Sequence, residues 1–238
     1  MVKGLIFDYG GTIDTNGIHW SEVLWQAYLR ENITISKQDF LDAYVYAERY
    51  FATNNVILPE HNFQDVLRLK TDIETKYLLD KGIFQVHELT RRADAEHIAL
   101  DCYRFVLDVL NTSRDVLQKL SQKYPLILVS NFYGNIHSVL NDFDLEYFSD
   151  VIESAVVGCR KPDARIFQMG VDSLGFDAKE VVVIGDSLSN DIVPADKIGC
   201  QTIWLKGKTW NSDKESDELS LNNQPRVITS FTELLYCL

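Results

Sequence analysis

The chain has 238 residues, of which 46% are hydrophobic and 24% charged, and it carries a formal net charge of −12 at pH 7. This is the composition of a globular protein, with room for one large domain or a core domain with a smaller insert. The acidic balance argues against a surface that binds nucleic acid or anionic lipid. An anionic substrate would therefore need a local positive group or a metal.

The first apolar stretch of the chain ends in Asp8 and is too short for a signal sequence or a membrane span. The four cysteines are scattered without C-x-x-C spacing, which favours reduced side chains. We expect a cytoplasmic protein with a small-molecule partner and with neither a membrane nor a nucleic-acid partner.

Residues 2–7 form a short apolar run, rich in residues that favour strands, and the run stops at Asp8 and a Gly-Gly pair. Such a run predicts a buried parallel strand that ends in a tight loop.

From residue 16 to residue 110 the strand signal gives way to helical periodicity. Four apolar stripes recur at spacings of three and four: Trp20, Val23, Leu24, Ala27 and Tyr28; Phe40, Leu41, Tyr44, Ala47 and Phe51; Phe63, Val66, Leu67, Ile73 and Tyr77; and Ile98, Cys102, Phe105, Val106 and Val109. Four amphipathic helices of this kind predict a small bundle with its own core. Arg91 and Arg92, between these helices, are expected to be solvated rather than to bind substrate.

Three later runs, 126–129, 181–184 and 202–205, resemble the first strand, and helical patterns occupy 135–141, 163–174 and 189–198. Alternating strands and helices predict an α/β fold with a doubly wound, Rossmann-like parallel sheet. We expect residues 1–15 and 111–238 to form this core and residues 16–110 to form an inserted helical cap domain. The polar stretch 206–224 predicts a solvated surface loop.

Ligands of an open parallel sheet bind beyond the carboxyl ends of its strands, so the polar residues at those ends are the candidate site. They are Asp8, Ser130, Asn131, Asp186 and Asp191, together with Lys161, which opens a helix. Paired carboxylates with loop carbonyls suit Mg²⁺, and a carboxylate beside the metal can attack phosphorus. A lysine, hydroxyls and backbone N–H groups would surround the charged phosphoryl oxygens. Gly10 and Gly11 allow close approach of the backbone, and Thr12 adds a hydroxyl.

The sequence resembles the haloacid dehalogenase-like (HAD) hydrolase superfamily. The four motifs of that family match Asp8-Tyr9-Gly10-Gly11-Thr12, then Ser130, then Lys161, and then Gly185-Asp186 through Asp191, in the expected order. The helical insert lies where the family has its cap domain. The resemblance implies a magnesium-dependent phosphatase that acts on a small phosphorylated metabolite through an aspartyl-phosphate intermediate.

The resemblance also implies roles for individual residues. Asp8 would be the nucleophile and a metal ligand, with the Gly10 carbonyl and Asp186 as further metal ligands. Phosphate would be bound by Gly11, Thr12, Ser130, Asn131 and Lys161, and Lys161 would neutralise its charge. Asp191 would orient Lys161 or metal-bound water. Asp14 would be a supporting residue of the loop that follows the first predicted strand, which we call the first loop.

The sequence departs from the family at Gly10, where phosphatases usually carry an aspartate that serves as general acid and base. Another group, such as Asp14, His19 or a cap residue, could replace it. The substrate could instead have a good leaving group, or the protein could be a weak or lapsed enzyme. Asp14 is expected to brace the loop rather than to catalyse.

Two alternatives to the phosphatase stay open. A 2-haloacid dehalogenase-like hydrolase also lacks the aspartate at the position of Gly10, but it needs no metal. Asp186 argues against this activity, because an unneutralised carboxylate beside Asp8 would repel an incoming haloacid. The other alternative is a phosphate-binding regulatory module with weak or lost catalysis.

Overall fold

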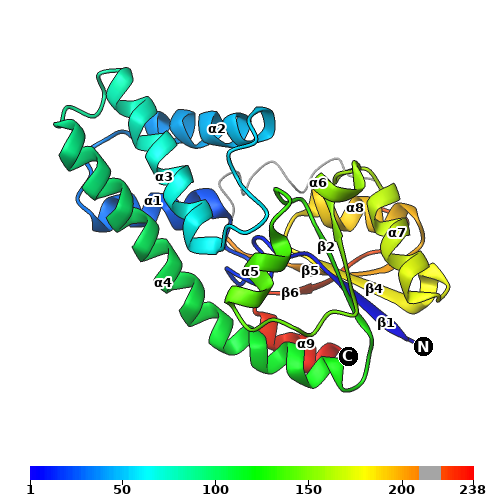
Figure 1. Ribbon diagram of the computed structural model, residues 1–238. Helices are drawn as coiled ribbons and strands as arrows, with labels where there is room; N and C mark the ends of the chain where they lie inside the picture. Colours follow the sequence, from blue (N-terminus) through cyan, green and yellow to red (C-terminus); the bar gives the residue numbers. More distant parts are fainter. Residues whose placement is uncertain (209–220) are drawn as a thin grey trace.

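The computed structural model describes residues 1–208 and 221–238 (Figure 1). Most of the loop predicted for 206–224 therefore lies outside the described residues. Within the described part of the chain, six parallel strands form one sheet in the order β3-β2-β1-β4-β5-β6. The strands are β1 (Gly4–Phe7), β2 (Leu126–Ser130), β3 (Asp150–Glu153), β4 (Val181–Gly185), β5 (Gln201–Leu205) and β6 (Arg226–Ile228).

The structure confirms the α/β class and the four predicted strands, and it adds the strands β3 and β6. These two lie at the edges of the sheet and begin with exposed or half-exposed residues. An edge strand buries less of its surface than a central one, so its sequence lacks the continuous apolar run by which the four others were recognised.

Helices cover both faces of the sheet. On one face, α4 (Glu88–Ser121), α5 (Ile136–Asp142) and α9 (Leu234–Cys237) pack on alternate strand residues that include Leu5, Phe7 and Leu128. On the other face, α7 (Arg165–Leu174) and α8 (Val193–Lys197) pack on residues that include Ile6 and Ile127. Short helical turns complete the core: α6 (Ser154–Val157), 178–180, 188–192 and 231–233. The helix predicted for 189–198 is thus a π-helical turn followed by α8.

The predicted four-helix insert is present after β1 and comprises α1 (Trp20–Arg30), α2 (Lys37–Thr53), α3 (Phe63–Asp80) and the first part of α4. Side chains cap the first turn of each helix, and Asn62 and Asp65 form a reciprocal capping box at α3. Helix α4 is 34 residues long and runs from the bundle to the sheet (Figure 1). The domain division at residue 110 stays a prediction, and α4 passes through it as one helix.

The buried face of α3 differs from its predicted apolar stripe. Lys70 and Glu74 are buried, whereas Ile73 and Tyr77 are only partly buried. The buried positions 63, 67, 70, 74 and 78 follow one another at spacings of three and four, so they share a face of the helix. Sequence hydrophobicity placed Ile73 on that face, but the geometry of the helix places charged residues there.

Arg91 was wrongly expected to be solvated, since its exposed fraction is 1%. Its guanidinium donates to the carboxylate of Asp72 at 2.7 Å and to Thr75 Oγ1 at 2.9 Å, and it forms an ion pair with Glu88. These partners all lie in α3 and α4, so Arg91 joins two cap helices and does not serve the site. No helix among the described residues is both long and apolar enough to cross a membrane.

Candidate active site

The topology of the sheet places the candidate residues together at the carboxyl ends of its central strands. The chain order reverses between β1 and β4, and ligands of such sheets bind at this switch point. Asp8 follows β1 and Asp186 follows β4, and the two strands are paired with Phe7 opposite Ile184. Residue Ser130 ends the neighbouring β2.

Lys161 connects two carboxylates of the site. Its Nζ donates to Asp8 Oδ1 at 2.5 Å and to Asp191 Oδ1 at 2.7 Å, and all three residues are buried. Burial alone would lower the pKa of the ammonium group, but Asp191 and Asp8 outweigh it and hold the pKa of Lys161 above its ordinary value. Lys161 therefore stays charged and fixes the direction of the Asp8 carboxylate.

Asp8, Asp186 and Asp191 form a buried acidic cluster in which carboxylate oxygens lie within 4.8 Å of one another. Burial, with the charges of Asp8 and Asp191, raises the pKa of Asp186 well above its usual range. Burial also raises the pKa of Asp191 to about 6, although Lys161 opposes this. One lysine offsets the charge of only one of these carboxylates, so the cluster fits a divalent cation.

Two glycines make this close packing possible. Gly11 has φ +95°, and a Cβ atom added there would lie 2.4 Å from Asp186 Oδ2. At Gly185, the last residue of β4, an added Cβ would lie 2.4 Å from the Cβ of Asp191. Both positions therefore need glycine to admit the carboxylates.

The first loop is braced by its own polar residues. Thr12 Oγ1 donates to Asp8 Oδ2 at 3.0 Å and lies 3.3 Å from Asp186 Oδ1. Asp14 accepts from the backbone N–H of Gly11 at 2.7 Å and from Trp20 Nε1 at 2.9 Å. The phosphate contacts expected of Thr12 and Gly11 stay predictions, since here the Thr12 hydroxyl and the Gly11 N–H contact carboxylates.

Asp14 is fully buried, and burial raises its pKa to about 7 against the effect of its two hydrogen bonds. Its carboxylate oxygens are occupied by Gly11 and Trp20. The structure thus places Asp14 where it holds the loop in shape.

Asn131 binds the segment that carries Lys161. Its side-chain amide donates to the Lys161 carbonyl at 3.1 Å and accepts from the Lys161 N–H at 2.9 Å. Ser130 is 1% exposed and lines the cavity at Asp8 together with Asn131 and Lys161. The loop after β2 thus positions Lys161, although Asn131 and Lys161 are separated by 30 residues in the sequence.

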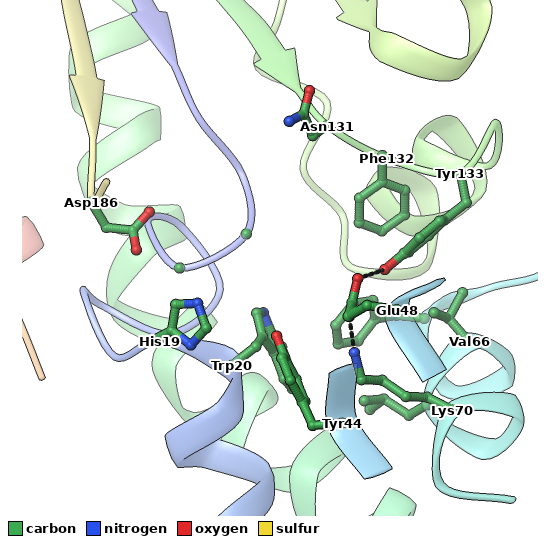
Figure 2. Close-up of a pocket in the computed structure, with 14 residues that line it drawn as sticks. His19, Trp20, Tyr44, Glu48, Val66, Lys70, Asn131, Phe132, Tyr133 and Asp186 are labelled. Carbon is green, nitrogen blue, oxygen red and sulfur yellow. Dashed lines mark hydrogen bonds and ion pairs between the residues drawn. The ribbon is translucent and has the colours of Figure 1, made fainter. Parts of the chain in front are cut away.

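A second cavity extends from this one toward the cap, and Gly10, His19, Asn131 and Asp186 line both. His19 caps α1, since its Nδ1 accepts from the Ser21 N–H at 3.2 Å. Burial and the charge of Lys70 lower the pKa of His19. Figure 2 shows the His19 ring between Asp186 and Trp20.

Lys70 and Glu48 line this second cavity and were missed by the sequence analysis. Each interrupts an apolar stripe of its helix, because Lys70 follows Leu67 by three positions and Glu48 follows Tyr44 by four. Charged residues at such positions are the signal that could have identified them.

The fold, the helical insert and the acidic cluster define a hydrolase of the HAD type. The family model of the haloacid dehalogenase-like hydrolases matches residues 2–199, so the chain belongs to this family.

Among its relatives, a glyceraldehyde 3-phosphate phosphatase of Methanocaldococcus jannaschii is 41% identical over 222 residues, which cover 92% of this chain and 91% of that protein. The 5-amino-6-(5-phospho-D-ribitylamino)uracil phosphatase YigB of Escherichia coli is 28% identical over 157 residues. That match covers 63% of this chain and 64% of YigB, slightly less than two thirds of its length.

Solved structures of low sequence identity share the fold. The HAD-hydrolase YfnB from Bacillus subtilis, in a structure bound to magnesium, has a TM-score of 0.58 at 20% identity, covering 100% of this chain and 98% of that one. A dehalogenase in an intermediate complex has a TM-score of 0.64 at 16% identity, with 100% and 97% covered.

Proposed function

We propose that the protein is a magnesium-dependent phosphatase that hydrolyses a small phosphorylated metabolite through an aspartyl-phosphate formed on Asp8. The observation that carries the proposal is the arrangement of Asp8, which is held by Lys161 and Thr12 beside Asp186 and Asp191. The names of the relatives in M. jannaschii and E. coli support a phosphate monoester as substrate.

Asp8 and Asp186, with the Gly10 carbonyl, would hold the Mg²⁺ ion. When bound, the ion would offset the charge of the carboxylates and polarise the phosphoryl oxygens. The buried position of the acidic cluster supports this assignment, because uncompensated carboxylates at such short separations oppose folding.

Within this site an oxygen of Asp8 would attack phosphorus, and the bond from phosphorus to the leaving oxygen would break. Lys161 and the Ser130 hydroxyl would stabilise the negative charge on the phosphoryl oxygens. Water would then attack the phosphorus of the aspartyl-phosphate, which releases phosphate and restores the Asp8 carboxylate. Asp191 would hold Lys161 in place through both steps.

The leaving oxygen needs a proton, and Gly10 has no group to give one. Asp14 is poorly placed for this role, since its two oxygens accept hydrogen bonds from the Gly11 N–H and from Trp20 of α1. His19 is better placed, because it lines both the cavity at Asp8 and the cavity toward the cap. We therefore assign Asp14 the bracing of the loop and His19 the role of candidate proton donor to the leaving oxygen.

The test is hydrolysis of acetyl phosphate and p-nitrophenyl phosphate with and without Mg²⁺. We expect magnesium-dependent turnover in the parent and a loss of at least about a thousandfold in Asp8→Asn. Asp177→Asn is the matched control, because its side chain is 69% exposed and lies outside the site. Titration calorimetry should show weaker Mg²⁺ binding in Asp186→Asn, independently of turnover.

The alternatives give different results. Metal-independent release of chloride from 2-chloropropionate would favour a dehalogenase. Binding of phosphate without turnover of any phosphate monoester would favour a regulatory module.

A further inference from the structure

The cavity toward the cap is the continuation of the site at Asp8. We call it the cap cavity, and it is bounded by the loop of Gly10 and Gly11 on the core side and by Lys70 and Glu48 on the cap side. Its volume is about 200 Å³. A water molecule occupies about 30 Å³ in the liquid, so the cap cavity has room for a group of several carbon atoms. A substrate whose phosphate lies at Asp8 has this cavity for its leaving group.

Several aromatic side chains line the walls of the cap cavity. They include Trp20, Tyr44, Phe63, Phe132 and Tyr133, from the cap helices and from the loop after β2. Several of these rings support one another: Trp20 and Phe63 have centroids 5.4 Å apart, and Phe132 and Tyr133 have centroids 5.2 Å apart. Flat apolar surfaces of this kind pack well against the C–H faces of a small organic group.

One ion pair lies among these rings. Lys70 is 5% exposed, and its Nζ donates to Glu48 Oε1 and lies 4.3 Å from the centroid of the Tyr44 ring. The second oxygen of Glu48 accepts from the Tyr133 hydroxyl at 3.3 Å. Figure 2 shows Glu48 between Lys70 and Tyr133. The pair thus extends from two cap helices to the core at the wall of the cavity.

Both partners are ionised. Burial opposes the charge of each, but Lys70 lowers the pKa of Glu48, and Glu48 raises the pKa of Lys70. The two charges cancel, so this end of the cavity offers no net positive charge to a substrate. It still offers hydrogen bonds, since an ammonium group has three donors and a carboxylate has several acceptor positions.

We propose that Lys70 and Glu48 recognise the leaving group of the substrate and that this group is uncharged and hydroxylated, as in a sugar or polyol phosphate. Hydroxyl groups can accept from Lys70 and donate to Glu48 without disturbing the pair. A carboxylate-bearing leaving group would instead compete with Glu48 for Lys70 and would lie beside the charge of Glu48. The inference rests on the proposed phosphatase function, since it assumes that phosphate binds at Asp8.

The experiment compares kcat/KM for ribose 5-phosphate, glyceraldehyde 3-phosphate and phosphoglycolate, each divided by the value for acetyl phosphate in the same variant. In the parent we expect both sugar phosphates to exceed phosphoglycolate by about tenfold or more, since hydrogen bonds to charged groups have this effect. In Glu48→Gln, Lys70 loses its ion-pair partner, so the ratio of phosphoglycolate to sugar phosphate should rise by about tenfold or more.

Lys70→Met should lower the normalised value for sugar phosphates by about 10- to 100-fold. The double variant Lys70→Met with Glu48→Leu separates recognition from folding, because it removes both charges together and leaves neither one without its partner. We expect it to remain folded and to lose the preference for sugar phosphates. Lys76→Met, on an exposed face of the same helix, is the matched control and should leave both ratios unchanged.

A parent that prefers phosphoglycolate, or a folded double variant that keeps the sugar preference, would overturn the inference. These results are distinct from a failure of the proposed function, in which the parent would not hydrolyse acetyl phosphate at all.

Discussion

Replacement of Lys161 by methionine tests the electrostatic account of the site, because it removes the one charge that joins Asp8 and Asp191 and keeps most of the side-chain volume. Three buried carboxylates would remain within 4.8 Å of one another. Removing one partner of a buried ion pair costs about 3–5 kcal/mol. Each kcal/mol lowers the Tm of a chain of this size by about 2–4 °C, so the metal-free variant should melt roughly 6–20 °C below the parent.

The difference in Tm between the parent and Lys161→Met should also depend on pH. The pKa of Asp191 is about 6 in the folded protein, above its ordinary value of about 3.9 in the unfolded chain. Between these values the folded state binds more protons than the unfolded state, so the stability of the metal-free parent should fall as the pH rises through this window. Lys161 lowers the pKa of Asp191, so its removal should extend the window above pH 6. The Tm deficit of Lys161→Met should therefore grow from about pH 5 to about pH 8.

The measurement is thermal unfolding followed by circular dichroism in the presence of a chelator, across this pH range. Lys179→Met serves as the control, since the Lys179 side chain is 77% exposed. Added Mg²⁺ should recover part of the lost Tm, because a bound cation again offsets the carboxylates. The reasoning is refuted if Lys161→Met melts no lower than Lys179→Met, or if its deficit is the same at every pH.

Two glycines of the first loop give further predictions. Gly11→Ala should reduce turnover by about a hundredfold and weaken Mg²⁺ binding in calorimetry, because the added Cβ would collide with Asp186. Gly175→Ala is the control: Gly175 has a similar φ but open space around it, so this change should affect neither turnover nor Mg²⁺ binding. Gly10→Asp should raise kcat for glycerol phosphate by about tenfold or more in a steady-state assay, because an added Cβ would lie 3.9 Å from Trp20 Nε1, an ordinary contact, and the carboxyl could supply the missing proton. An equal gain in Gly10→Asn would contradict this explanation.

The sequence was sufficient to predict the four central strands of the sheet and the polar residues at their carboxyl ends, because both depend on local patterns. Buried central strands such as β1 and β4 have continuous apolar runs, and the residues that follow them necessarily meet at one edge of a parallel sheet. The sequence alone therefore predicts that Asp8 and Asp186 lie close together.

The contacts of the first loop could not be predicted in the same way. The direction of the Gly11 N–H toward Asp14, and of the Thr12 hydroxyl toward Asp8, depends on a backbone with φ +95° at Gly11. A Gly-Gly pair permits many conformations, so the sequence indicates a turn without selecting this one.

The ion pair of Lys70 and Glu48 could not be predicted from the sequence, for a different reason. The two residues lie on different helices, and the hydroxyl that Glu48 accepts from belongs to Tyr133 of the core. Their meeting depends on how α2 and α3 sit relative to each other and to the loop after β2. Periodicity along one helix contains no information about that arrangement.

The distribution of charge between the two ends of the site bears on how a substrate would enter. At the sheet, three carboxylates share one lysine, and under the proposed function this end would need a cation before it receives a phosphate. In the cap cavity, the charges of Lys70 and Glu48 cancel, and several aromatic side chains line the walls. With Mg²⁺ bound, the attraction for an anion would therefore be confined to the end at Asp8. A phosphate monoester with a neutral leaving group would be drawn in phosphate first, whereas a substrate charged at both ends would find an attractive site for only one of them.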